Sequence, residues 1–374
     1  MDYLRYYIGP LMQLIGIAGL LAGGGWVWAG IGTFFSLTFI DPLFGEDERR
    51  RTMTSQTMAD FPIYLAAFLG LIVYFALAWQ AGQGNLSALE VIGMILSAGW
   101  LSVVPMVPAL HEMYHKRFPL RRFFGVYLQV VYGDASRGLA HMNTHHLHVG
   151  TSRDPDSPPR GETAYQFIPR AIIENWREGY ALEKASLTKR GLSPWSIHGQ
   201  FPKAILAQLL LSASLGVIGG WQAVAVGLGA TALARMWIEL FNYFQHYGIV
   251  RVDGKPVEKR HVWNHLSTFV RTAGFEITNH ADHHLDAYIP YFKLVPDTNG
   301  PRMPGFLTCF WASLIPPLWF KYIAQPRLRD WDTRFASPEE RALAREANRR
   351  AGWPDWFVEK EAKTAAGQAA VVAG

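Results

Sequence analysis

Long apolar stretches alternate with polar segments along the 374 residues of this chain. A helix that crosses a membrane needs about 20 mostly apolar residues. Six stretches come near that length: 6–22, 26–41, 61–80, 89–109, 203–219 and 221–245. Gly23-Gly24-Gly25 joins the first two and Gly219-Gly220 joins the last two, which is typical of helical hairpins. The pattern therefore predicts an all-α integral-membrane protein with six transmembrane helices.

Positive charge is unevenly distributed over the segments that connect these stretches. Lys and Arg occur in the 41–60 loop and after the fourth and sixth stretches, whereas none occurs in the connections 23–25, 81–88 and 219–220. Because cytoplasmic loops carry an excess of Lys and Arg, we expect a bacterial-type inner-membrane protein with both termini in the cytoplasm. The alternative, a soluble protein with buried helices, does not explain this alternation.

The polar segments predict a helical cytoplasmic cap, formed by 110–202 and 246–360, on a single domain that covers 1–374. The Ala-rich tail at 361–374 is expected to be disordered. The apolar run 306–324 is interrupted by two prolines, so we interpret it as an interfacial or re-entrant segment. Ser337, followed by proline and two glutamates, predicts the start of a helix.

Nine of the 13 histidines fall into four clusters at or just after the predicted cytoplasmic ends of spans. Imidazole is the commonest protein ligand for metals such as iron and zinc. A helix brings residues i, i+3 and i+4 onto one face, so each cluster can present its imidazoles together. Nine ligands exceed the roughly four to six that one ion takes, so the pattern predicts two metal ions at one membrane face.

The single cysteine, Cys309, limits which cofactors this chain can hold. One thiol cannot build an intrachain disulfide, a Cys-ligated zinc site or an iron–sulfur cluster. No Gly-x-Gly-x-x-Gly follows a strand pattern, so no flavin or nicotinamide site is predicted. We expect no bound haem and no nucleic-acid partner. Electrons would therefore have to come from another protein.

The His111-Glu112-x-x-His115 motif has two further interpretations. It matches the helix of zinc proteases, in which the glutamate is the base, but that site needs one more ligand rather than three more clusters. It also matches di-iron carboxylate bundles, which need additional carboxylates. An isolated histidine pair is more often structural, whereas ionisable clusters at the edge of a membrane are usually functional.

Taken together, the clusters resemble the integral-membrane non-haem di-iron monooxygenases, the alkane hydroxylase and xylene monooxygenase family. Its four histidine boxes are matched by His111–Lys116, His141–His146, Asn242–Gly248 and His280–His284. The third and fourth boxes are most similar to the hydroxylase component of xylene or p-cymene monooxygenase. Alkane hydroxylases have other residues at the positions of Ala140, Thr144 and Gln245, and at the last of these positions they usually have Glu. These differences favour the aromatic branch of the family.

The resemblance implies two non-haem irons, O2 as co-substrate, and hydroxylation of a methyl group on an alkyl-substituted aromatic hydrocarbon such as toluene, xylene or cymene. It implies an NADH-dependent reductase with flavin and a [2Fe–2S] cluster as the electron donor, with rubredoxin as the alternative. The apolar substrate would enter from the bilayer. The implied metal ligands are His111, His115, His141, His145, His146, His246, His280, His283 and His284.

Other residues are expected to support this site. His148 competes with His146 as a ligand, because on a regular helix it shares the face of His141 and His145 better than His146 does. Trp100 and Trp237 are candidates for the substrate pocket. Arg341, Arg345 and Arg349 form a basic stripe that could dock the reductase or contact lipid headgroups. Candidates for orienting the imidazoles are Glu112, Asp134, His148, Glu239, His261, His265, Asp282 and Asp286.

Two other functions stay open on the sequence alone. An alkane hydroxylase, or a fatty-acyl hydroxylase or desaturase, would use similar boxes, but the desaturase group lacks the Asn-Tyr-x-x-His-Tyr-Gly element. A metal transporter or storage protein belongs to a different class. Transport would place ligands along a path near the midplane of the membrane, whereas these histidines lie at one face.

Overall fold

The computed structural model describes residues 2–357, and the predicted disordered tail at 361–374 lies outside the described residues. Every named element in the described part is helical. Five of its helical stretches are long and apolar enough to cross a membrane: Asp2–Ala22, Gly24–Phe44, Gln56–Gly82, Ala88–Tyr114 and Gln200–His246. These findings confirm the predicted all-α integral-membrane class.

The fifth stretch, α11 (Gln200–His246), is two helices rather than one. Its helical dihedral angles are interrupted at Gly219 and Gly220, where φ of Gly220 is 71°. A Cβ on Gly227 would lie 2.5 Å from Cδ1 of Leu215, although 12 residues of continuous helix would separate these positions by about 18 Å. The chain therefore folds back at the two glycines, as the predicted hairpin requires. The number of membrane crossings stays a prediction.

The first two stretches form a similar hairpin. It comprises α1 (Asp2–Arg5), α2 (Ile8–Ala22), η1 (Gly24–Trp28) and α3 (Ala29–Phe44). A Cβ on Gly16 would lie 3.4 Å from the Cα of Gly30, so small residues let the two arms approach closely. The central helices are α4 (Gln56–Gly82), α5 (Ala88–Val103) and α6 (Met106–Tyr114). The α4 helix packs against α2 and α11, and α5 packs against α3 and α11.

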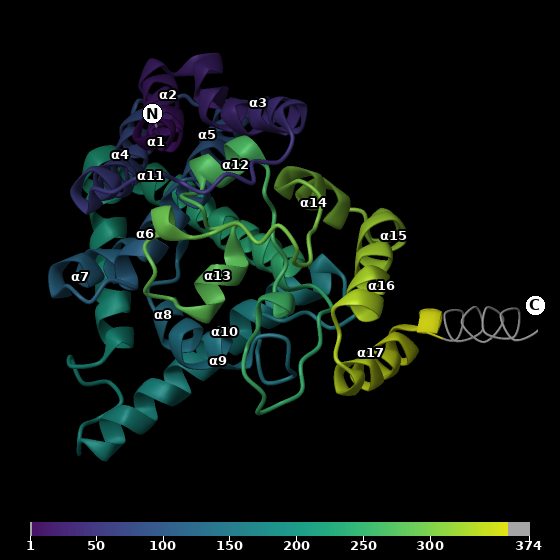
Figure 1. Ribbon diagram of the computed structural model, residues 1–374. Coiled ribbons are helices and arrows are strands. Elements are labelled where there is room, and N and C mark those ends of the chain that lie inside the picture. Colours follow the sequence, from purple (N-terminus) through teal and green to yellow (C-terminus); the bar gives the residue numbers. More distant parts are fainter. Residues whose placement is uncertain (1, 358–374) are drawn as a thin grey trace, which may run out of the picture.

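The long helix α10 and a series of shorter helices account for the other helical elements of the described structure (Figure 1). Between α6 and α11 the chain forms α7 (Pro119–Tyr127), η2 (Leu128–Tyr132), α8 (Arg137–Ala140), η3 (His141–His145), α9 (His146–His148) and α10 (Ala164–Lys189). After α11 it forms η4 (Lys259–His261), α12 (Thr268–Ala273), α13 (His280–Leu285), η5 (Tyr291–Lys293), α14 (Phe306–Ser313), α15 (Pro316–Leu318), η6 (Trp319–Ala324), α16 (Gln325–Arg334) and α17 (Pro338–Ala351).

Two features of the C-terminal part agree with the predictions made from the sequence. The apolar run 306–324 is divided among α14, α15 and η6 and is not one of the helices long enough to span. The predicted helix start at Ser337 is confirmed, because its hydroxyl accepts a hydrogen bond from the Glu340 backbone N–H and Glu340 caps Ser337 in return. The single-domain description of the chain stays a prediction.

Candidate metal centre

Nine histidines from four separate segments meet beside the end of α6. Two groups of four each place their ring nitrogens within 4.8 Å of one another. One group contains His111, His115, His141 and His283, and the other contains His145, His246, His280 and His284. The ninth, His146, lies beside them, with its ring centre 4.9 Å from that of His283 and 4.8 Å from that of His284.

Helical spacing explains most of this convergence. His111 in α6 and His115, the residue that caps the end of this helix, are one turn apart, and their Nε2 atoms lie 3.3 Å from each other. In α13, the Nε2 atoms of His280 and His284 lie 3.0 Å apart for the same reason. His246, the last residue of α11, places its Nε2 atom 3.1 Å from that of His280.

The second box departs from α-helical spacing. Residues His141–His145 form a π-helical turn, in which the His146 N–H donates to the carbonyl of His141. A π turn aligns residues i and i+5, so the Nε2 atoms of His141 and His146 lie 3.1 Å apart. His148 points elsewhere, with its Nδ1 3.9 Å from a carboxylate oxygen of Asp253. The regular helix on which the case for His148 depends does not form.

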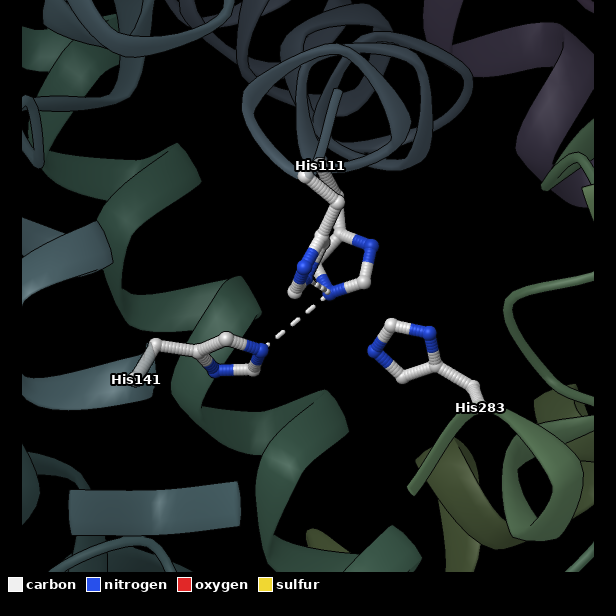
Figure 2. Close-up of side chains that lie close together, drawn as sticks. His111, His141 and His283 are labelled. Carbon is white, nitrogen blue, oxygen red and sulfur yellow. Dashed lines mark hydrogen bonds between the residues drawn. The ribbon is translucent and has the colours of Figure 1, made fainter. Parts of the chain in front are cut away.

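The imidazoles point toward a common centre. Figure 2 shows His111, His141 and His283 facing one another from α6, η3 and α13. The Nε2 atoms of His111 and His141 lie 3.2 Å apart. Nitrogens that each lie about 2.1 Å from a shared ion are separated by roughly 3.0–3.4 Å, so these contacts have the spacing of a common metal ligand set.

The electrostatics of the cluster also fit metal binding. The Nε2 atoms of His145 and His283 are buried and have no hydrogen-bond partner in the described part of the chain. Burial, together with neighbouring imidazoles, holds the pKa of His141, His146 and His283 well below the ordinary value. Neutral imidazoles keep a lone pair available for a metal, and a nitrogen-only set without thiolate suits iron.

Asp154 orients one imidazole, and the sequence prediction missed it. The Nδ1 of His145 donates to Asp154 Oδ2 over 2.9 Å, which leaves Nε2 directed into the cluster. Burial lowers the pKa of His145, but the charge and hydrogen bond of Asp154 outweigh it and raise that pKa overall. The available signal was Asp154-Pro155-Asp156, which closely follows the second box in a loop rich in chain breakers.

Asp134 and Glu239, two predicted supporting residues, lie in a buried ionic network. Arg137 Nη1 lies 2.9 Å from Asp134 and 3.0 Å from Glu239. The same guanidinium reaches Asp156 over 3.4 Å, and Asp156 lies 4.0 Å from Nδ1 of His145. The network therefore connects to the histidines through Asp156.

The other residues predicted to orient the imidazoles form ion pairs or hydrogen bonds with other residues of the chain. Glu112 pairs with Lys116 over 2.5 Å, and Asp282 pairs with Lys259 over 2.6 Å. A role for Glu112, Asp282 or Asp286 toward a metal stays a prediction. The remaining contacts are those of Asp286 with the Tyr288 N–H, His261 with Glu340, and His265 with the Pro304 carbonyl.

A buried carboxylate just before the fourth box in the sequence positions that box. Glu276 and the preceding Phe275 have φ values of 62° and 46°, which non-glycine residues rarely adopt. Glu276 pairs with Arg51 over 2.7 Å and with Arg271, both of which are buried. Because such strain persists only where the surroundings enforce it, these ion pairs fix the backbone four residues before His280.

A cavity of about 70 Å³ adjoins the histidines. His111, His141 and His280 form part of its wall, and most of the remaining wall is apolar. Trp100 and Trp237 are not among its lining residues; both pack against Phe34, with ring centres 4.9 and 5.8 Å from it. Their predicted contact with substrate stays a prediction. Apolar lining residues include Val104, Val107, Ile238, Phe241, Val270 and Phe306.

The basic stripe on α17 contacts its own chain. Arg341 donates to the carbonyls of Asp332 and Thr333, and Arg349 pairs with Glu346 over 2.7 Å. Nε of Arg345 lies 3.7 Å from Asp355. Of the three, Arg349 is the most exposed, at 74% of its side chain, so it is best placed to meet another molecule.

Known proteins resemble the chain over nearly its whole length. The fatty acid desaturase family model matches residues 86–299, which include all four histidine clusters. The hydroxylase component of the xylene/toluene monooxygenase of Pseudomonas putida is 41% identical, over 95% of this chain and 97% of that protein. Alkane 1-monooxygenase 2 of Alcanivorax borkumensis is 29% identical, over 85% of this chain and 87% of its own. Alkane 1-monooxygenase 1 of Pseudomonas aeruginosa is also 29% identical, over 83% and 84%.

Proposed function

From the premise that this chain belongs to the fatty acid desaturase family and, within it, to the membrane-bound monooxygenases, we infer its reaction. We propose that it uses O2 to hydroxylate a methyl group of an alkyl-substituted aromatic hydrocarbon, giving a benzylic alcohol. The observation that most directly supports this reaction is the 41% identity to a xylene/toluene monooxygenase hydroxylase component over 95% of the chain. The apolar cavity beside the histidines supports a hydrocarbon substrate.

Two iron ions are proposed as the cofactor. His111, His115, His141 and His283 would hold one, and the other group of four would hold the second. His146, whose Nε2 atom is 3.1 Å from that of His141, is the ninth proposed ligand. When bound, iron supplies the redox chemistry that activates O2. The lowered pKa values of His141, His146 and His283 favour neutral imidazoles, and Asp154 holds the His145 ring by its other nitrogen.

The cavity wall would orient the substrate. Its apolar side chains bind a hydrocarbon by removing apolar surface from water, and they exclude water from the reacting carbon. Since His111, His141 and His280 form part of the wall, a methyl group directed at these residues would be the position hydroxylated. We propose that the hydrocarbon enters from the bilayer, where apolar molecules concentrate.

Electrons are proposed to come from outside the chain. Cys309, its single cysteine, is buried. We propose an NADH-dependent reductase with flavin and a [2Fe–2S] cluster as the donor, with rubredoxin as the alternative. The donor would dock on the cytoplasmic face of an inner-membrane protein that has six crossings and both termini inside, and the stripe on α17 is the candidate docking surface.

The test is product identification in whole cells that express this chain together with the reductase. Cells fed toluene, xylene or cymene under ¹⁸O2 should form the benzylic alcohol with one labelled oxygen atom. The control is His141→Ala, which removes one proposed ligand and should form no alcohol. Strong turnover of medium-chain alkanes, with none on the three aromatic substrates, would overturn the substrate class. An oxidised fatty-acyl product alone would instead assign the chain to the desaturase-type chemistry.

A further inference from the structure

Apart from the histidines, two polar groups in the cavity wall have no hydrogen-bond partner among residues 2–357. They are Nε2 of Gln245 and Oγ1 of Thr278. Both residues are buried, with 6% and 1% of their surface exposed. Gln245 directly precedes His246, and Thr278 precedes His280 by two positions. Both therefore lie on the segments that carry the proposed ligands His246 and His280.

The other non-histidine polar residues of the wall differ from this pair. Arg137 is paired with Asp134 and Glu239, and Asn242 donates to Glu239 over 3.1 Å. Their polar groups are thus directed into the ionic network behind the cavity. Among the non-histidine residues of the described wall, only Gln245 and Thr278 have a buried side-chain polar atom without a hydrogen-bond partner. Leaving such groups buried and unpaired costs free energy, which a suitable ligand would recover.

The chemistry of the pair identifies the ligand. A hydrocarbon offers no hydrogen bond, so it cannot satisfy either group. An alcohol offers one O–H donor and an acceptor oxygen, which match a hydroxyl that accepts and an amide N–H that donates. We propose that Gln245 and Thr278 form a subsite for the hydroxyl group of the alcohol product, an inference that rests on the proposed function. The subsite distinguishes product from substrate inside one apolar cavity.

The ring of substrate and product contacts the same apolar wall, so the two should differ in affinity mainly through this hydrogen-bonding pair. Removing one hydrogen bond weakens binding by about five- to tenfold. The loss should appear for benzyl alcohol and be absent for toluene.

The test is direct binding to the iron-loaded enzyme in lipid nanodiscs, without reductant, using benzyl alcohol and toluene as probes. Thr278→Val keeps the side-chain shape and removes the hydroxyl, and Gln245→Met keeps the length and removes the amide. Each should raise the dissociation constant for benzyl alcohol about five- to tenfold and leave that for toluene unchanged within about twofold. Thr278→Ser, which restores a hydroxyl, should bind benzyl alcohol as the wild type does.

Thr272→Val is the matched control. Thr272 is buried and its hydroxyl donates to the Thr268 carbonyl over 2.7 Å, but it does not line the cavity. It should leave both dissociation constants unchanged. Equal weakening of both probes by Thr278→Val would mean that only packing was lost, and no change for either probe would mean that the hydroxyl binds water alone. Either result overturns the proposal.

Iron content, measured for every variant, identifies any that fails to assemble. If Gln245→Met loses iron, the comparison of Thr278→Val with Thr278→Ser still decides the proposal. Binding requires no turnover, so this experiment is separate from the test of function. The wild-type enzyme could hydroxylate toluene and yet bind benzyl alcohol no more tightly than the Thr278→Val variant does. That result would contradict the subsite and leave the proposed function intact.

Discussion

The Nε2 atoms of His141 and His146 lie 3.1 Å apart although the two residues are five positions apart in the sequence. The π-helical turn makes this contact possible, because it places residues i and i+5 on one face. His148, which a regular α-helix would bring to that face, instead lies 3.9 Å from Asp253. Single-turn π segments occur often at functional sites, and here the turn selects which histidine joins the cluster.

The first prediction separates the two histidines. His146→Ala should lower the iron bound per chain, because its ring nitrogen lies within the cluster. His148→Ala should retain the wild-type iron content and product formation. Elemental analysis of the purified variants measures the first quantity. Full iron in His146→Ala, together with loss in His148→Ala, would reverse the proposed ligand assignment.

The second prediction concerns Asp154, which holds the His145 ring by Nδ1. Asp154→Ala should weaken iron binding about 10- to 100-fold, the usual effect of removing a carboxylate that orients a ligand imidazole. Competition with a chelator measures the affinity. Asp253→Asn is the control, because Asp253 approaches His148 and its side chain is 56% exposed. Equal iron affinity in Asp154→Ala and wild type would show that the hydrogen bond does not position a ligand.

The third prediction tests the helical hairpin at Gly219. A Cβ at this position would lie 2.0 Å from the carbonyl oxygen of Ala78, a backbone atom that can move only with α4. Gly219→Ala should therefore lower the stability by about 1–3 kcal/mol. Gly25→Ala is the control, because its added Cβ would meet no atom within 4 Å. Matching thermal unfolding midpoints for the two variants would argue against close packing of α11 on α4.

The fourth prediction tests the proposed docking surface on α17. Replacing Arg345 and Arg349 by Glu should raise the apparent KM for the reductase and flatten its dependence on salt, since charge complementarity speeds weak encounters. Arg341 is left intact because it donates to two backbone carbonyls of its own chain. The matched control reverses the charge of Arg190, an exposed residue after α10, by replacing it with Glu. A change in membrane retention with unaltered reductase kinetics would identify the stripe as a lipid contact.

The fifth prediction is a pH dependence of stability that arises from Glu340. Burial raises its pKa, but hydrogen bonds from His261, the Ser337 N–H and Arg260 outweigh burial and lower it from 4.5 to about 2. A carboxyl whose pKa is lowered in the folded state contributes stability that is complete above pH 4.5 and is lost as the pH falls toward 2.

Glu340→Gln should therefore unfold more easily than wild type at pH 7, by about 1–3 kcal/mol, and the difference should shrink below pH 4.5. Thermal unfolding of both proteins at pH 7 and pH 3 measures this difference. Glu339→Gln, on the exposed side of the same helix turn, is the control and should show no such trend. A gap that stays constant between the two pH values would contradict the assignment to the carboxylate.

The sequence by itself determined the class of the fold and the chemistry of the site. Apolar length predicts helices that can span a membrane, and runs of two or three glycines predict the turns between them, because both depend only on neighbouring residues. The structure confirms each of these features. Clustered histidines at the ends of apolar stretches likewise predict metal binding without any knowledge of tertiary contacts, because imidazole is a metal ligand wherever it is brought together.

Only the tertiary structure decided which residues meet. Helical periodicity favours His148, but the π turn changes the backbone hydrogen-bond register and brings in His146 instead. Asp154 lies in an irregular loop, and no periodic pattern predicts that its carboxylate reaches His145. Glu276 pairs with Arg51 across 225 positions of the chain. Such contacts depend on how distant segments pack, and local sequence patterns, which are set by near neighbours, do not encode that packing.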